Sequence, residues 1–200
     1  MSESETVLVI GTKNYSSWSL RPWILLRKLG IPFREIVLDF DDPAFHEEVA
    51  RHSPSRRVPV LIDGELRVWE SIAICEYASE KAAGRGWPED AAARAHARAI
   101  SAEMHAGFAA LRRQCPMNAR ARGRRVASTP ELEADLRRID AIWTECRRRH
   151  AAAGPWLFGR YSVADAMFAP VALRCLTYGL PLGEEARGYL DAALADGDLR

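Results

Sequence analysis

The sequence lacks several features that would point to a particular compartment or partner. No apolar run approaches the roughly 20 residues that a membrane-spanning helix needs. The opening segment, MSESETVLVI, has no basic region and passes straight into a strand pattern, which argues against a secretory signal peptide. The formal net charge is only +1, although 25 of the 28 basic residues are arginine. This balance gives no reason to expect nucleic acid or a membrane as a partner.

Cysteine is scarce and scattered. The four cysteines are Cys75, Cys115, Cys146 and Cys175. They form no CxxC pair, and no histidine lies at metal-ligand spacing from them. The pattern therefore predicts reduced, mostly buried thiols in a cytoplasmic protein, with no bound metal and no disulfide framework.

What the chain does contain is two unlike halves. Up to about Lys81, short apolar strands alternate with helices. The expected elements, in order, are a strand at 7–10, a helix at about 20–29 closed by Gly30, a strand within 31–40, a short helix at about 43–51, two strands joined at Asp63-Gly64, and a helix at 71–81. This order predicts a small α/β domain of the thioredoxin type.

Everything beyond residue 90 follows a helical pattern. Apolar residues recur at helical spacing over 97–111 and 132–146, and a last helix is expected at about 184–194. The segment Ser162-Val-Ala-Asp165 has the form of a capping box ahead of a long apolar run. We therefore expect a thioredoxin-like domain at 1–82, a linker at 83–90 that is rich in glycine and proline signals, and an all-helical domain at 91–200.

The most informative local segment is NYSSWSLRPWILLRKLGI at 14–31. Ser16 and Ser17 lie where the first strand gives way to the N-terminus of a helix. The unpaired backbone N–H groups of such a terminus stabilise an anion, and a serine hydroxyl aimed at a thiol would there favour the thiolate. The alternative is that the serines only cap the helix.

Three short motifs occur in a fixed order: SSWS at 16–19, RVPVL at 57–61 and ESIA at 70–73. With the box at 162–165 and the helical second half, they resemble the soluble glutathione transferase superfamily over nearly the whole chain. The resemblance is to a bacterial serine-type member, distantly similar to the zeta, tau and omega classes. It implies the glutathione transferase fold and glutathione as co-substrate.

The resemblance also assigns roles to the first motif. Ser16 matches the serine whose hydroxyl faces the glutathione sulfur, with Ser17 as the second candidate and Tyr15 as a weaker one. Trp18 stands where the zeta and beta classes carry a cysteine. This difference argues against thiol-dependent reductase chemistry and against zeta-like isomerase activity.

The other two motifs would hold the peptide. In the family, the proline of Val58-Pro59 is cis, so that Val58 offers its N–H and C=O to the cysteinyl unit as a short added strand. Ser71 would hold the γ-glutamyl carboxylate, Glu70 the ammonium group, and Arg57 the glycyl carboxylate. The alternatives are a proline at a strand start, an ordinary helix N-cap and a solvated arginine.

The resemblance implies that the second domain lines the pocket for the electrophile. Core packing is the alternative for its apolar members, and a structural role is the alternative for the histidine. The arginine-rich segment 112–125 either attracts an anion or is a solvated loop. The candidate pocket residues are Trp18, Met104, His105, Phe108, Arg112, Met117 and Asn118.

The leading hypothesis is a homodimeric glutathione transferase that conjugates glutathione to a small hydrophobic electrophile in detoxification. Two alternatives stay open: a glutathione-dependent cis–trans isomerase similar to maleylacetoacetate isomerase, and a non-catalytic module that binds glutathione or docks a partner. Family members usually continue through another helix after the position of Arg200. We therefore expect either a more open pocket or a sequence that continues.

Overall fold

The computed structural model describes residues 5–199. Residues 1–4 and Arg200 lie outside the described residues. Residues 1–4 begin the segment that is expected not to be a signal peptide. The chain divides into two compact units, Met1–Gly86 and Trp87–Arg200, and each is described by itself. Among the helices of residues 5–199, none is long and apolar enough to cross a membrane.

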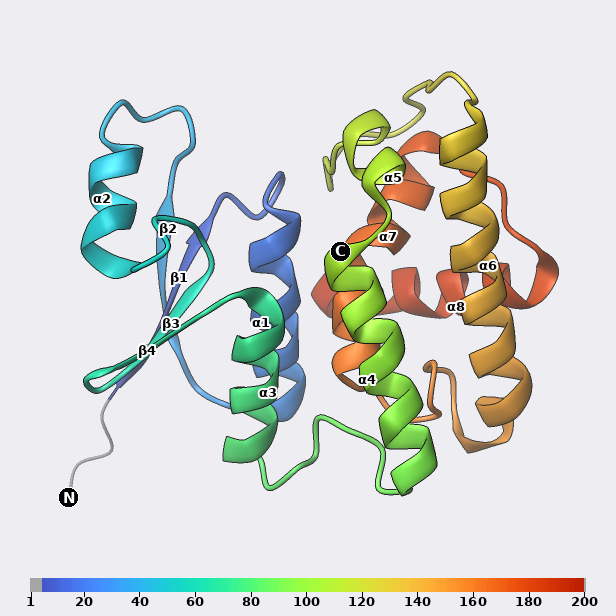
Figure 1. Cartoon of the computed structure of the whole chain (residues 1–200), viewed down its shortest axis with the longest axis horizontal. Coiled ribbons are helices and arrows are strands. Elements are labelled where there is room, and N and C mark those ends of the chain that lie inside the picture. The colour runs from blue at the N-terminus through green and yellow to red at the C-terminus, as the bar shows by residue number, and fades with distance from the viewer. Residues whose placement is uncertain (1–4, 200) are drawn as a thin grey trace. The chain divides into compact units, whose positions relative to one another are not determined.

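The first unit is a four-stranded sheet with three helices (Figure 1). Its strands lie in the order β2-β1-β3-β4, with β1 parallel to β2 and antiparallel to β3, and with β3 antiparallel to β4. The predicted thioredoxin-like order is therefore confirmed. The elements are β1 (Thr6–Gly11), α1 (Ser17–Leu29), β2 (Arg34–Leu38), α2 (Phe45–His52), β3 (Val60–Asp63), β4 (Leu66–Trp69) and α3 (Ser71–Lys81).

The core of this unit is built on β1, which is buried along its whole length. Successive side chains of a strand point to opposite faces of the sheet, so Val7 and Val9 pack with Val60 on one face. Helices α1 and α3 pack against each other, and both bury apolar side chains completely. Figure 1 shows these two helices running in the same direction, so their N-termini lie towards the same end of the unit.

The helix and turn signals in this unit are confirmed with small shifts. Helix α1 ends at Gly30, whose φ of +70° is the left-handed conformation expected of a glycine C-cap. It begins at Ser17, three residues before the expected Leu20, because Ser16 provides the N-cap. The β3–β4 loop is Gly64-Glu65, one residue further along than expected, since Asp63 still pairs with Leu66.

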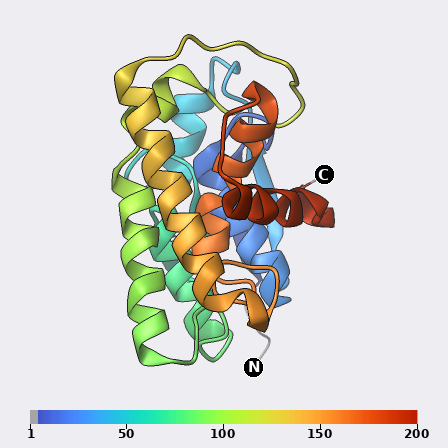
Figure 2. The ribbon, with the colours of Figure 1, turned by 90° about the vertical axis from the view of Figure 1, so that its right-hand side faces the viewer.

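The second unit is helical throughout its regular structure (Figure 2). Helix α8 packs against α6 and runs across its direction, as Figures 1 and 2 show. Helix α7 packs against both α4 and α8. The elements are α4 (Ala91–Ala106), α5 (Ala109–Gln114), α6 (Pro130–His150), α7 (Val163–Tyr178) and α8 (Glu184–Ala195), with short 3-10 helices at Ala151–Ala153 and Gly197–Leu199.

Two features of this unit bear on the sequence predictions. The capping box is confirmed: it starts α7, which is then buried at every position from Val163 to Cys175. The continuous helical pattern over 97–111 is broken in the structure. Gly107 ends α4, and Phe108 adopts a left-handed conformation with φ of +60° before α5 begins. Apolar spacing alone did not reveal this break, because the same spacing continues on both sides of it.

Candidate functional site

The serine turn links the end of β1 to the start of α1. The Ser16 hydroxyl oxygen accepts the backbone N–H of Ser19 at 3.3 Å, which makes Ser16 the N-cap of the helix. The Ser16 hydroxyl also donates to Ser19 Oγ at 2.7 Å. Ser19 Oγ in turn accepts the backbone N–H of Gly11 at 3.1 Å. Ser16 is therefore both a helix cap and a member of a buried hydroxyl pair.

The neighbours of Ser16 have different environments. Ser17 is buried as the first residue of α1, and its N–H donates to the carbonyl of Tyr15 at 3.0 Å. The Tyr15 side chain is 56 % exposed. Trp18 is half-buried, with the guanidinium of the fully buried Arg21 lying 4.4 Å from the centre of its ring. Arg21 thus packs within this unit.

The second motif leads into β3. The Val58-Pro59 peptide bond is cis, as expected. Pro59 is buried and Val58 half-buried, and Val58 lies before the strand ladder, whose pairing starts at Val60. Arg57 is exposed. These positions place a main-chain segment beside the sheet without including it in the ladder.

The third motif has the most unusual local structure. Glu70 precedes α3 with a φ of +68°, a conformation that residues other than glycine rarely adopt. Ser71 then begins the helix and is only 1 % exposed. Within residues 5–199 its hydroxyl oxygen has no hydrogen-bond partner. A buried hydroxyl without a partner is unfavourable, so a polar ligand group placed there would be stabilised.

The predicted pocket residues of the second unit gather around the break between α4 and α5. Met104 is fully buried, Phe108 is 6 % exposed and His105 is half-buried. The Arg112 guanidinium donates to the carbonyls of Gly107 at 2.9 Å and His105 at 3.3 Å, and also to that of Met104. These contacts are those of a helix junction held together by an arginine.

Met117 and Asn118 are buried in the loop that follows α5. The Asn118 side-chain oxygen accepts the backbone N–H groups of Arg120 at 3.2 Å and Ala121 at 3.0 Å. The Asn118 side chain therefore shapes its own loop.

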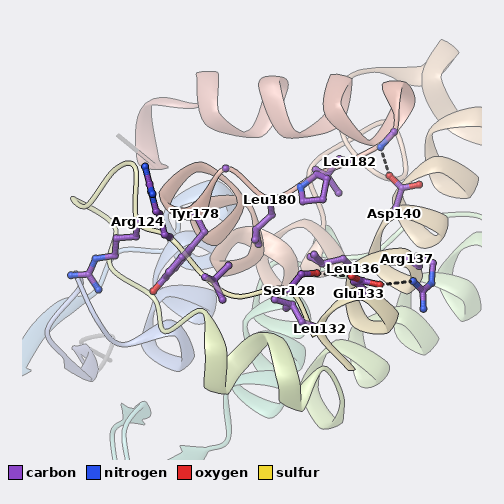
Figure 3. A pocket seen from close by; sticks show the side chains of 15 residues that line it. Arg124, Ser128, Leu132, Glu133, Leu136, Arg137, Asp140, Tyr178, Leu180 and Leu182 are labelled. Carbon is purple, nitrogen blue, oxygen red and sulfur yellow. Dashed lines mark hydrogen bonds and ion pairs between the residues drawn. The ribbon is translucent and has the colours of Figure 1, made fainter. Parts of the chain in front are cut away.

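A cavity of about 810 Å³ lies elsewhere in the second unit (Figure 3). Figure 3 shows apolar side chains of α6 and of the loop after α7 in its centre, and Arg124 at one end. Glu133 bonds with Ser128 at 2.6 Å and pairs with Arg137 at 3.6 Å. None of the predicted pocket residues is among the residues that line this cavity. The sequence signal for this cavity was the apolar pair Leu180 and Leu182, which follows Gly179, the left-handed C-cap of α7.

The chain's own cysteines are poor candidates for thiol chemistry. All four are free and buried, as the sequence predicted. Burial raises the pKa of Cys75, Cys146 and Cys175 to about 12 and also raises the pKa of Cys115. A thiol must ionise to act as a nucleophile, so burial disfavours the reactive form of all four. In residues 5–199 no group of three or more His, Cys, Asp or Glu side chains is placed to hold a metal ion.

Comparison with known proteins identifies the first unit. The family model described as the glutathione S-transferase N-terminal domain matches residues 15–81, a range that includes all three motifs. Residues 15–81 therefore belong to the glutathione S-transferase N-terminal domain family. It is 39% identical over 61 residues to dichloromethane dehalogenase from Methylorubrum extorquens and 41% identical over 56 residues to that from Methylophilus leisingeri.

These relatives are similar to this chain over a limited segment. The matches cover 30% and 26% of this chain, and they span only 21% and 20% of the lengths of the two dehalogenases. The shared segment therefore represents about a fifth of each relative.

Solved structures extend the likeness in fold to nearly the whole chain. A glutathione transferase homologue from Burkholderia GL BGR1 with bound glutathione has a TM-score of 0.73 at 22% identity, covering 98% of this chain and 95% of that one. The yeast prion protein Ure2p in complex with glutathione has a TM-score of 0.75 at 21% identity, with coverages of 100% and 92%. Omega 3C from Trametes versicolor has a TM-score of 0.74 at 18% identity, with coverages of 99% and 88%. Both units thus have the glutathione transferase fold.

One contact in this transferase fold was not predicted from the sequence, namely the pairing of Ser16 with Ser19. The signal was present in the SSWS motif, because a side chain at the N-cap meets the residue three positions later.

Proposed function

We propose that the protein binds glutathione in its first unit, stabilises the thiolate and transfers it to a small hydrophobic electrophile. The observation that carries the proposal is the buried Ser71 hydroxyl, which has no partner in the described residues and begins a helix inside the matched family segment. Glutathione itself, unlike the buried cysteines, would supply a thiol that can ionise.

The peptide would be held by three groups of atoms. The N–H and C=O of Val58 would pair with the cysteinyl unit, because Val58 lies outside the strand ladder. Ser71 would donate to the γ-glutamyl carboxylate at the positive end of α3, and Glu70 would face the ammonium group. The exposed Arg57 would reach the glycyl carboxylate.

The thiol would be activated at the N-terminus of α1. Loss of its proton to water leaves a thiolate, which the Ser16 hydroxyl and the helix N-terminus would stabilise, with Ser17 as the second candidate. The sulfur lone pair then forms the bond to carbon while the leaving group departs with its electrons. The name of the dehalogenase relatives makes a dihalomethane a reasonable first electrophile to assay.

The rest of the sequence-based assignment stays a prediction. This applies to the homodimer and to the electrophile-pocket residues Trp18, Met104, His105, Phe108 and Arg112. Isomerisation of a conjugated diketo acid remains the other enzymatic hypothesis.

A non-catalytic glutathione-binding module is the second candidate. It is favoured by one observation: the Ser16 hydroxyl is already engaged as a helix cap and as a donor to Ser19. In such a module the peptide would bind but its thiol would not be activated.

Isothermal titration calorimetry with reduced glutathione tests the binding part of the proposal. We expect Ser71→Ala to weaken binding by about 10- to 100-fold, because a hydrogen bond to a charged group contributes roughly 1.5–3 kcal/mol. Ser101→Ala is the matched control, since Ser101 is also a fully buried helical serine whose hydroxyl lacks a partner in the described part of the chain. Equal affinity of wild type and Ser71→Ala would contradict the assigned site.

A further inference from the structure

The buried pair Ser16–Ser19 connects the turn to the end of β1. Ser19 is 1 % exposed and Ser16 is 6 % exposed. The order of contacts is the Gly11 N–H to Ser19 Oγ at 3.1 Å, and Ser19 Oγ to Ser16 Oγ at 2.7 Å. Gly11 is the last residue of β1, so its N–H is fixed by the sheet. The hydroxyl pair therefore rests on a rigid donor.

The hydrogens of this pair limit what Ser16 can do alone. A hydroxyl has one hydrogen and two acceptor lone pairs. One Ser16 lone pair accepts the Ser19 N–H, and the Ser16 hydrogen is directed at Ser19 Oγ. To donate to a thiolate, Ser16 must turn its hydrogen away from Ser19. The short contact between the two oxygens then persists only if Ser19 becomes the donor.

We propose that Ser19 is a positioning residue that reverses its hydrogen bond with Ser16 when a thiolate is bound. The resulting chain runs from the Gly11 N–H to Ser19 Oγ, from the Ser19 O–H to Ser16 Oγ, and from the Ser16 O–H to sulfur. Each donor in such a chain polarises the next and strengthens its bond. No covalent bond changes, since only the two hydroxyl hydrogens rotate. The inference rests on the proposed function.

Charged groups near the turn would also act on a bound thiolate, but they are the same in every serine variant. Lys13 forms an ion pair with Glu35 at 2.6 Å, and Arg21 lies against the ring of Trp18. These groups contribute a constant field to any bound thiolate. A substitution of either serine leaves them in place, so a change in thiol pKa on substitution reports on the hydroxyls.

The test is a double-mutant cycle on the pKa of the thiol of bound glutathione. Thiolate absorbance of the complex is titrated against pH for the wild-type chain, Ser16→Ala, Ser19→Ala and the double variant, each at saturating glutathione. Ser79→Ala is the matched control, because Ser79 is also a buried helical serine whose hydroxyl accepts a glycine N–H, that of Gly86 at 3.2 Å. Circular dichroism confirms that each variant is folded.

We expect Ser16→Ala to move the thiol pKa back towards that of free glutathione and to lower the conjugation rate on the order of 10²-fold. Ser19→Ala should shift the pKa in the same direction by a smaller amount and lower the rate roughly tenfold, with little change in affinity. In the Ser16→Ala background, Ser19→Ala should have no further effect, because Ser19 acts through Ser16. Ser79→Ala should leave the pKa unchanged.

Two results would overturn the inference. The first is a thiol pKa in Ser19→Ala that is as low as in the wild-type complex, while Ser16→Ala raises the pKa to that of free glutathione. The second is equal effects of Ser19→Ala with and without Ser16, which would mean a general structural role. An unshifted thiol pKa in the wild-type complex would instead refute the proposed function itself, so the two failures are distinguishable.

Discussion

The carboxylate of Asp165 accepts both the backbone N–H and the hydroxyl of Ser162 through its Oδ2 atom, each at 2.9 Å. Its Oδ1 atom accepts the Leu157 N–H at 2.9 Å and the Tyr189 hydroxyl at 3.2 Å. Asp165 is 2 % exposed. One buried carboxylate therefore joins the start of α7, the loop before it and α8.

Replacing this carboxylate should destabilise the second unit. Asp165→Asn would turn an amide N–H₂ group towards donors, and we expect a loss of about 2–4 kcal/mol in the free energy of unfolding. Urea denaturation followed by circular dichroism measures it. Asp140→Asn is the control, because Asp140 is only partly buried and accepts the single N–H of Gly183. Equal losses in the two variants would show that the network adds nothing beyond one hydrogen bond.

The same residue predicts an unusual pH dependence. Burial raises the pKa of Asp165 from 3.8 to about 6, and the hydrogen bonds it accepts only partly oppose this rise. The folded state then binds the proton more tightly than the unfolded state. The stabilisation from this group, about 3 kcal/mol, is therefore fully present below pH 3.8 and is lost as the pH rises to about 6.

Urea denaturation of wild type and Asp165→Asn between pH 3.5 and 7 checks this sign. The difference in unfolding free energy between the two proteins should be larger at the acid end of the range than at pH 7. A difference that instead grows with rising pH would mean that the carboxylate is stabilised by its donors, with a native pKa below the ordinary value.

Arg112 allows the helix-junction role to be separated from the predicted pocket role. Because its guanidinium donates to carbonyls at the end of α4, Arg112→Ala should cost about 1–3 kcal/mol of unfolding free energy. Arg113→Ala, at the neighbouring exposed position, should cost almost nothing. The KM for the electrophile should change only if Arg112 also lines the pocket. A fully stable Arg112→Ala variant would contradict the junction role.

Local signals made much of the fold predictable. Gly30 at a helix end and the Ser162 to Asp165 box depend on residues within one turn, and the structure confirms both. The break at Phe108 could not be predicted from apolar spacing, because it depends on Arg112, four residues later. The Arg112 guanidinium donates to the carbonyl of Gly107, which the break leaves without a helical partner.

The candidate site was predictable in part, because some of its features also depend on residues that lie close together in the sequence. The serine turn before α1 and the start of α3 at Ser71 follow from short motifs, whereas the cis Val58-Pro59 bond was expected from the family resemblance. Two other features depend on packing. They are the hydrogen bond from the Gly11 N–H to Ser19 Oγ, and the lack of a partner for the Ser71 hydroxyl in the described structure. No spacing rule encodes such packing.

The most direct test of thiol activation is the pKa of the glutathione thiol in the wild-type complex. Ultraviolet difference titration measures it through thiolate absorbance. We predict a midpoint well below the value of about 8.5 for a free thiol, because the α1 N-terminus and the Ser16 hydroxyl would both stabilise the anion. A midpoint equal to that of free glutathione would contradict this prediction and would identify the protein as a binding module without thiol activation.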